Sequence, residues 1–201
     1  MNTHHIPQAP ADQQPALRTL ATAKQRGFTL VELMIVLTIV GILLSITVPS
    51  MAAIVDSVKL SSTTNMFMSS MRLARSESTR RGVRVAMCKS YDGTSCSVSG
   101  GWEQGWIVFQ DLNGNGDLDA NEKVIERVDG LASSLRFTGN QNVARYIAYN
   151  AGGTARTATG AMLAGTLTLC HVSASTAEGR LIVISSGGRA RVQQVPVGQC
   201  A

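Results

Sequence analysis

The chain has 201 residues, of which 44% are hydrophobic and 15% charged, and a formal net charge of +5. Once residues 1–27 and a long N-terminal helix are set aside, ~120 residues remain, which suits one small globular domain and is too few for a second core. The sequence has neither a nucleophile elbow nor a phosphate-binding glycine loop, so no pattern in it indicates an enzyme.

The chain begins with a polar segment and continues with an apolar one. Residues 1–27 have no hydrophobic periodicity and end with Lys24, Arg26 and Gly27. We interpret them as a disordered cytoplasmic leader. The apolar run 28–48 is long enough for one helix across a bilayer of ~30 Å.

The apolar run holds one charge, Glu32, in its second predicted helical turn. A carboxylate near the end of a membrane helix is costly, so it usually has a partner and a function. Gly41 and Pro49 should weaken the helix locally, because glycine adds backbone freedom and proline removes a hydrogen-bond donor.

The letters GFTLVE at 27–32 resemble the processing site of type IV prepilins and type II secretion pseudopilins. The resemblance implies that a prepilin peptidase cleaves after Gly27 and that the new amine of Phe28 is methylated. It also implies that 28–48 stays as a single-pass inner-membrane anchor and later packs in a filament. Glu32 would then pair with the Phe28 amine of a neighbouring subunit and set its register. The alternative is a plain N-terminal anchor.

A second helical segment follows the apolar run over 49–80, and Gly82 is expected to end it. Its apolar residues recur at a spacing near 3.6 and predict an amphipathic helix. The predicted stripe is Val55, Val58, Met66 or Phe67, Met71 and Ala74.

The rest of the chain, 81–201, has the patterns of strands and turns. Gly, Asn, Asp and Ser separate the predicted strands, which are 83–89, 105–110, 123–128, 134–137, 144–149, 165–171, 181–185 and 189–195. A long helix followed only by strands predicts an α+β fold with an antiparallel β-sheet domain, in one sheet or two small ones.

The strand Gly105–Phe109, the Asp/Asn/Gly turn after it and a late Gly-Arg pair narrow the resemblance to the FimT/GspH group of minor pilins and pseudopilins. Members have the pilin architecture of a long N-terminal helix and a β domain. The resemblance places the β domain in the periplasm, and implies other pilins or pseudopilins, the prepilin peptidase and the inner membrane as partners.

All four cysteines follow the predicted membrane helix and would therefore lie where disulfides form. Four cysteines allow three connectivities. We predict Cys88–Cys96, which flank a turn sequence, and Cys170–Cys200, which would hold the C-terminus to the sheet. The cysteine spacing does not match a zinc site.

The segment DLNGNGDLDANE at 111–122 fits the spacing of a calcium loop. The oxygen ligands would come from the side chains of Asp111, Asn113, Asn115, Asp117 and Glu122. The flanking segments are strand-like, however, and turn chemistry alone explains most of these residues. We therefore prefer a β-hairpin loop and keep calcium, the single candidate cofactor, as the alternative.

The segment GRAR at 188–191 is a candidate DNA site. Residues 130–201 carry six arginines against Glu178, which suits a polyanionic partner or a solvated surface. Strand periodicity predicts that Arg189 and Arg191 share a face after the Gly188 turn and can contact successive phosphates. In FimT-type minor pilins, a Gly-Arg-x-Arg element is associated with DNA binding in natural transformation.

The sequence thus predicts a non-catalytic subunit of a type IV pilus or type II secretion filament, with DNA binding through Gly188, Arg189 and Arg191. The alternative is a secretion pseudopilin of the GspH type with no DNA role. A DNA-binding receptor module is the rival from another class.

Overall fold

The computed structural model describes residues 27–172, 177–198 and 200, so the predicted leader lies outside the described residues except for Gly27. The chain forms two compact units, one up to Ser45 and the other from Ile46. Each unit is described by itself.

The first unit contains the beginning of helix α1, Leu30–Arg81. Thr29 caps this helix, because its hydroxyl accepts a hydrogen bond from the Glu32 amide at 3.2 Å. The large apolar side chains of residues 28–44 are all exposed, and they point to every side of the helix.

Over the described part of the chain, no helix combines the length and the apolar character that a bilayer crossing requires. The membrane span at 28–48 stays a prediction.

Helix α1 continues through Gly41 and Pro49, so the predicted weakening does not interrupt it. A glycine costs a helix about 1 kcal/mol and a proline removes one hydrogen bond, and neither change ends a helix by itself. The helix ends at Arg81, after which Gly82 adopts a φ of +67° that favours glycine.

The buried face of α1 differs from the predicted stripe. Val55 and Val58 are 46% and 61% exposed, so the stripe was wrong at both positions. The buried residues are Leu60, Thr63, Thr64, Phe67, Met68, Ser70, Met71, Ala74 and Ser78. Hydroxyl residues belong to this face because they bond within the helix; Thr64, for example, donates to the Leu60 carbonyl at 2.7 Å.

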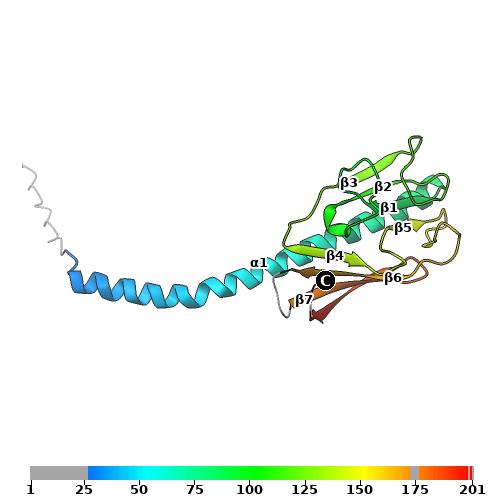
Figure 1. Cartoon of the computed structure of the whole chain (residues 1–201). Helices are drawn as coiled ribbons and strands as arrows, with labels where there is room; N and C mark the ends of the chain where they lie inside the picture. The colour runs from blue at the N-terminus through cyan, green and yellow to red at the C-terminus, as the bar shows by residue number, and fades with distance from the viewer. Residues whose placement is uncertain (1–26, 173–176, 199, 201) are drawn as a thin grey trace, which may run out of the picture. The chain divides into compact units, whose positions relative to one another are not determined.

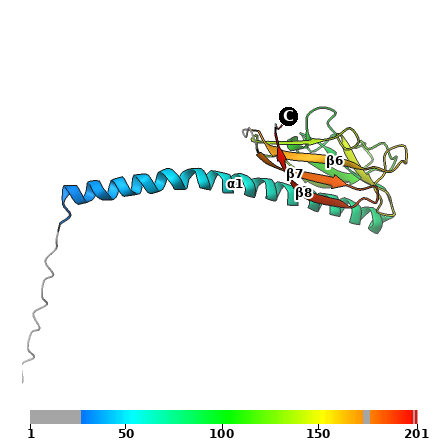
Figure 2. The same cartoon turned by 90° about the horizontal axis from the view of Figure 1, so that it is seen from below.

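The second unit has two antiparallel four-stranded sheets in the described residues. The first sheet has the order β3-β2-β1-β5, formed by Val124–Val128, Trp106–Gln110, Val85–Lys89 and Tyr146–Tyr149. The second has the order β4-β6-β7-β8, formed by Leu135–Gly139, Gly165–His171, Ala177–Ile184 and Ala190–Val197 (Figures 1 and 2). A short 3-10 helix, η1, spans Trp102–Gln104. The predicted α+β fold with two small sheets is confirmed.

The main core lies between α1 and the inner faces of both sheets. Period-2 alternation places Met87 and Val108 of the first sheet and Leu167 and Ile182 of the second on these inner faces, all of them buried. The core therefore combines side chains from the helix and from both sheets.

The outer face of the first sheet is buried as well. Ala86, Ile107, Phe109 and Ala148 form a second apolar cluster there, covered in part by Cys96 and Leu118 from two loops. This explains why β1 is buried at every position, whereas most antiparallel sheets keep one face in water.

The side chain of Phe67 connects the helix to both sheets. Its ring makes edge-to-face contacts with Trp106 of the first sheet at 5.1 Å, with Phe137 of the second at 4.7 Å and with Trp102 of η1 at 5.2 Å. The polar edges of both tryptophans are satisfied: Trp106 donates to the Ser70 hydroxyl and Trp102 to the Val143 carbonyl, each at 3.0 Å.

We expect Phe67→Ala to lower the free energy of unfolding by about 3–5 kcal/mol, because it leaves a cavity where three aromatic rings meet. The matched control is Met66→Ala on the same helix, where the side chain is 38% exposed and the loss should stay near 0.5 kcal/mol. Denaturant unfolding followed by tryptophan fluorescence measures both variants. Equal losses would contradict the central position of this ring.

Candidate functional site

The candidate site is built around the turn that joins β7 to β8. The Gly188 amide donates to the Ser185 carbonyl at 2.8 Å, and the Ser185 amide donates to the Arg189 carbonyl at 2.9 Å. Gly188 has a φ of +75°, and a Cβ there would lie 2.9 Å from the Tyr149 ring and 3.0 Å from the Ala155 amide nitrogen. Glycine is required both by the turn and by its close packing on the first sheet.

Arg189 and Arg191 are both exposed and line one surface hollow, together with Val183 and Ser185. The sequence predicted that β8 begins at Arg189, but the strand begins at Ala190 and Arg189 belongs to the turn. The backbone carbonyl of Arg189 accepts the hydrogen bond of the turn and is not part of the β7–β8 strand pairing. Both arginines nevertheless line the same hollow.

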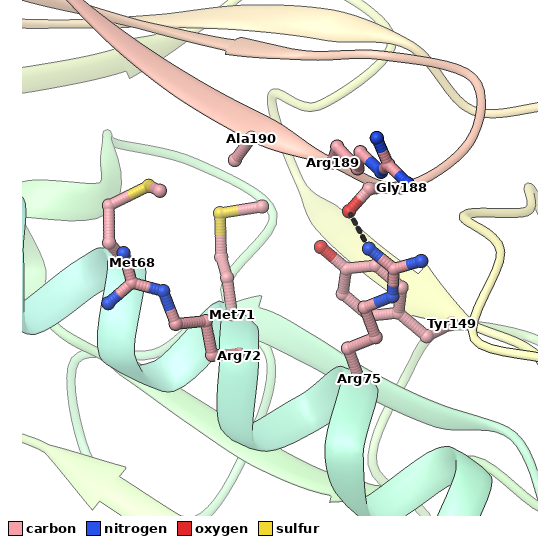
Figure 3. A pocket seen from close by; sticks show the side chains of 8 residues that line it. All are labelled: Met68, Met71, Arg72, Arg75, Tyr149, Gly188, Arg189 and Ala190. Carbon is pink, nitrogen blue, oxygen red and sulfur yellow. Dashed lines mark hydrogen bonds between the residues drawn. The ribbon is translucent and has the colours of Figure 1, made fainter.

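Two arginines of α1, Arg72 and Arg75, lie at the same turn and were not predicted as part of the site. Arg75 donates from Nη1 to the Gly188 carbonyl at 3.4 Å (Figure 3). Arg72, Arg75 and Arg189 together line a cavity between α1 and the turn. Sequence spacing gives no signal for this contact, since its partners are 113 positions apart.

Two further arginines of the β domain, Arg180 and Arg156, line neither the hollow nor the cavity. Arg180 is 4% exposed, and its Nη1 lies 3.8 Å from Oε2 of Glu178. Arg156 donates to the Gly160 carbonyl in its own loop. Tyr149 lines the cavity, and burial raises its pKa to about 12 while the charge of Arg75 lowers it in part, so its hydroxyl stays protonated at neutral pH.

The three acidic residues among the five predicted calcium ligands of the loop 111–122 each have a partner within the protein. Asp111 is fully buried and accepts from Arg84 Nε at 2.7 Å, and Asp117 pairs with Arg145. Glu122 accepts from the Leu112 and Asp119 amides.

Asn113 and Asn115 of this loop both donate to Asp119, at 2.7 and 2.9 Å. Among the described residues, no group of three or more His, Cys, Asp or Glu side chains is placed to hold a metal ion. The geometry is that of a hairpin loop between β2 and β3 whose polar side chains satisfy the loop backbone.

The structure contains two disulfides, Cys88–Cys96 and Cys170–Cys200, which are the pairs expected from the sequence. The first joins β1 to the loop that covers the outer face of the first sheet. The second joins the end of β6 to the penultimate residue.

The predicted processing residues are all exposed to solvent. Phe28 is 83% exposed, Gly27 has open space around it, and Glu32 is exposed in the first turn of α1.

Comparison with known proteins identifies the family. The family described as "Type II transport protein GspH" matches residues 63–188, more than half of the chain. The chain belongs to the GspH family. The prokaryotic N-terminal methylation motif matches residues 22–48. A search of curated proteins finds no match.

The solved structures of one minor pilin share the fold of this GspH-family chain at low sequence identity. The type IV minor pilin FimU of Pseudomonas aeruginosa, in two crystal forms, gives TM-scores of 0.53 and 0.51 at 18% identity. The matches cover 73% and 71% of this chain and 98% and 100% of FimU. The minor pseudopilin EpsH of Vibrio cholerae gives 0.45 at 10% identity, over 68% of this chain and 97% of EpsH.

The two aspartate–arginine pairs of the 111–122 loop allow a matched test. We expect Asp111→Asn to destabilise the protein by about 3–5 kcal/mol, because it leaves the guanidinium of Arg84, only 16% exposed, without its counter-charge. Asp117→Asn breaks an exposed pair and should cost under about 1 kcal/mol. Thermal melts with calcium and with chelator should be the same for wild type. A calcium-dependent rise in melting temperature that Asp111→Asn abolishes would establish a metal site instead.

Proposed function

We propose that the chain is a non-catalytic minor subunit of a type IV pilus or pseudopilus filament, held in the inner membrane by α1 with its β domain in the periplasm. Membership of the GspH family and the methylation motif at 22–48 support this proposal. The exposed apolar surface of residues 28–44 supports it as well, because such a surface needs lipid or neighbouring helices to cover it.

The proposed maturation begins with cleavage by a prepilin peptidase after Gly27 and methylation of the Phe28 amine. The chain would then enter a filament with other pilins or pseudopilins. Glu32 would pair there with the Phe28 amine of a neighbouring subunit. That amine is the closest new positive charge that processing creates.

Glu32→Ala should leave cleavage after Gly27 intact and strongly reduce incorporation into filaments, since a buried amine that loses its counter-charge costs about 3–5 kcal/mol. Thr38→Ala, an exposed polar position on the same helix, is the control and should assemble normally. Mass spectrometry of the mature N-terminus and immunoblots of sheared filaments measure the two steps. Normal assembly of the Glu32 variant would reject the register role.

We further propose that the β7–β8 turn binds DNA through the phosphate backbone, as part of natural transformation. The observation that carries this proposal is the pair of exposed guanidinium groups, Arg189 and Arg191, on a turn seated against the first sheet by Gly188. Contacts to phosphates would make the binding largely independent of sequence and sensitive to salt.

Replacing Arg189 and Arg191 with glutamine should remove most DNA binding and reduce the slope of log affinity against log salt by about two. The control is Arg127→Gln with Arg136→Gln, which removes the same charge from exposed positions on β3 and β4. Titration of labelled duplex DNA with the full chain in a non-ionic detergent, at two salt concentrations, measures both. If the two double variants lose affinity equally, the binding is a property of net charge and the turn has no special role.

The second candidate is a pseudopilin of type II protein secretion with no DNA role. The description of the matching family as type II transport favours it. Absence of any DNA binding by wild type in the titration above would select this candidate.

A further inference from the structure

The cavity between α1 and the β7–β8 turn has a volume of about 250 Å³. Known small-molecule sites usually measure ~300–1,000 Å³, so this cavity suits a fragment of a ligand and not a whole drug-sized molecule. Figure 3 shows the side chains of Met68 and Met71 on one side and the turn of Gly188 on the other. All of its lining residues belong to the second unit of the chain.

The rim of the cavity is positive. Three of its lining residues are arginines, Arg72, Arg75 and Arg189, and none of its lining residues is acidic. Within the described part of the chain, no carboxylate forms a salt bridge with Arg72 or Arg189, and both side chains are exposed. The rim therefore favours an anionic ligand.

The interior of the cavity is mainly apolar. Met68, Met71 and Tyr149 are each less than 8% exposed and present thioethers and a ring, while Ala190 adds a methyl group. Thioether sulfur is polarizable and makes favourable contacts with aromatic rings. An arginine beside the cavity can also stack on a flat aromatic group. The interior therefore favours a flat aromatic group and not a free phosphate.

A polynucleotide supplies both an anionic group for the rim and a flat aromatic group for the interior, because each of its bases lies between two phosphates. In a duplex the bases are paired and stacked, and a base must leave the stack before it can enter a protein pocket. In a single strand the bases are accessible to protein side chains.

We propose that this cavity binds one base of single-stranded DNA, with the flanking phosphates on Arg72 and Arg189. Arg75 acts as a positioning residue, because its hydrogen bond to the Gly188 carbonyl holds the turn that presents Arg189. This inference rests on the proposed DNA binding and adds to it a preference for single strands and a residue, Arg72, on the helix.

The test compares three labelled ligands of equal length on the full chain in a non-ionic detergent: oligothymidylate, an abasic oligomer and a duplex. Oligothymidylate should bind at least about fivefold more tightly than the abasic oligomer, which has the same phosphates and no bases. Arg72→Gln should weaken oligothymidylate binding several-fold and leave the melting temperature unchanged. Arg127→Gln is the control, since β3 and β5 lie at opposite edges of the first sheet and Tyr149 belongs to β5.

A second measurement reports on the cavity directly. In protein labelled at methionine methyl groups, oligothymidylate should shift the Met68 and Met71 signals through ring currents, and the abasic oligomer should not. Suppose that all three ligands bind with equal affinity and that the Arg189→Gln, Arg191→Gln variant still loses binding. This result would overturn the base pocket but would agree with contacts to the phosphate backbone. No binding of any oligomer would reject both proposals. Equal displacement by an oligoglutamate, with the same methyl shifts, would assign the cavity to acidic peptides and overturn the inference.

Discussion

The fold depends on the packing of the Phe67 ring against three other aromatic rings. A helix that lies on two separate sheets needs a buried group that touches both, and Phe67 meets Trp106 of the first sheet and Phe137 of the second. The β7–β8 turn of the second sheet is seated against Tyr149 of the first, so the candidate DNA site also requires the two sheets to be held in a fixed relation.

Much of the fold could be predicted from local pattern. All eight strands were expected within a few residues of their observed bounds, because turn-forming residues separate them clearly. The face of α1 was harder to predict, because Thr64 and Ser78 look polar in sequence and are buried in the structure. Their hydroxyls bond to carbonyls of the same helix, a solution that a hydrophobic pattern does not reveal.

The candidate site was predictable only in part. Gly188, Arg189 and Arg191 stand together in the sequence, so a motif finds them. Arg72 and Arg75 join them only because α1 packs beside the turn, and no spacing rule connects positions so far apart. The 111–122 loop has a metal-like spacing, but that spacing gave no sign of the ion pair between Asp111 and Arg84 or of the hydrogen bond from the Leu112 amide to Glu122.

The coverage of the first sheet on both faces has a consequence for how this protein can change over evolutionary time. A substitution at a position such as Ile107 or Ala148 meets packed neighbours, because the outer face of this sheet is covered as well as the inner one. On the outer face of the second sheet, Thr138, Thr168 and Gln193 are at least partly exposed. Divergence between relatives, and with it any adaptation to a new filament neighbour, should therefore accumulate on the second sheet and on β3, while β1, β2 and β5 stay nearly constant.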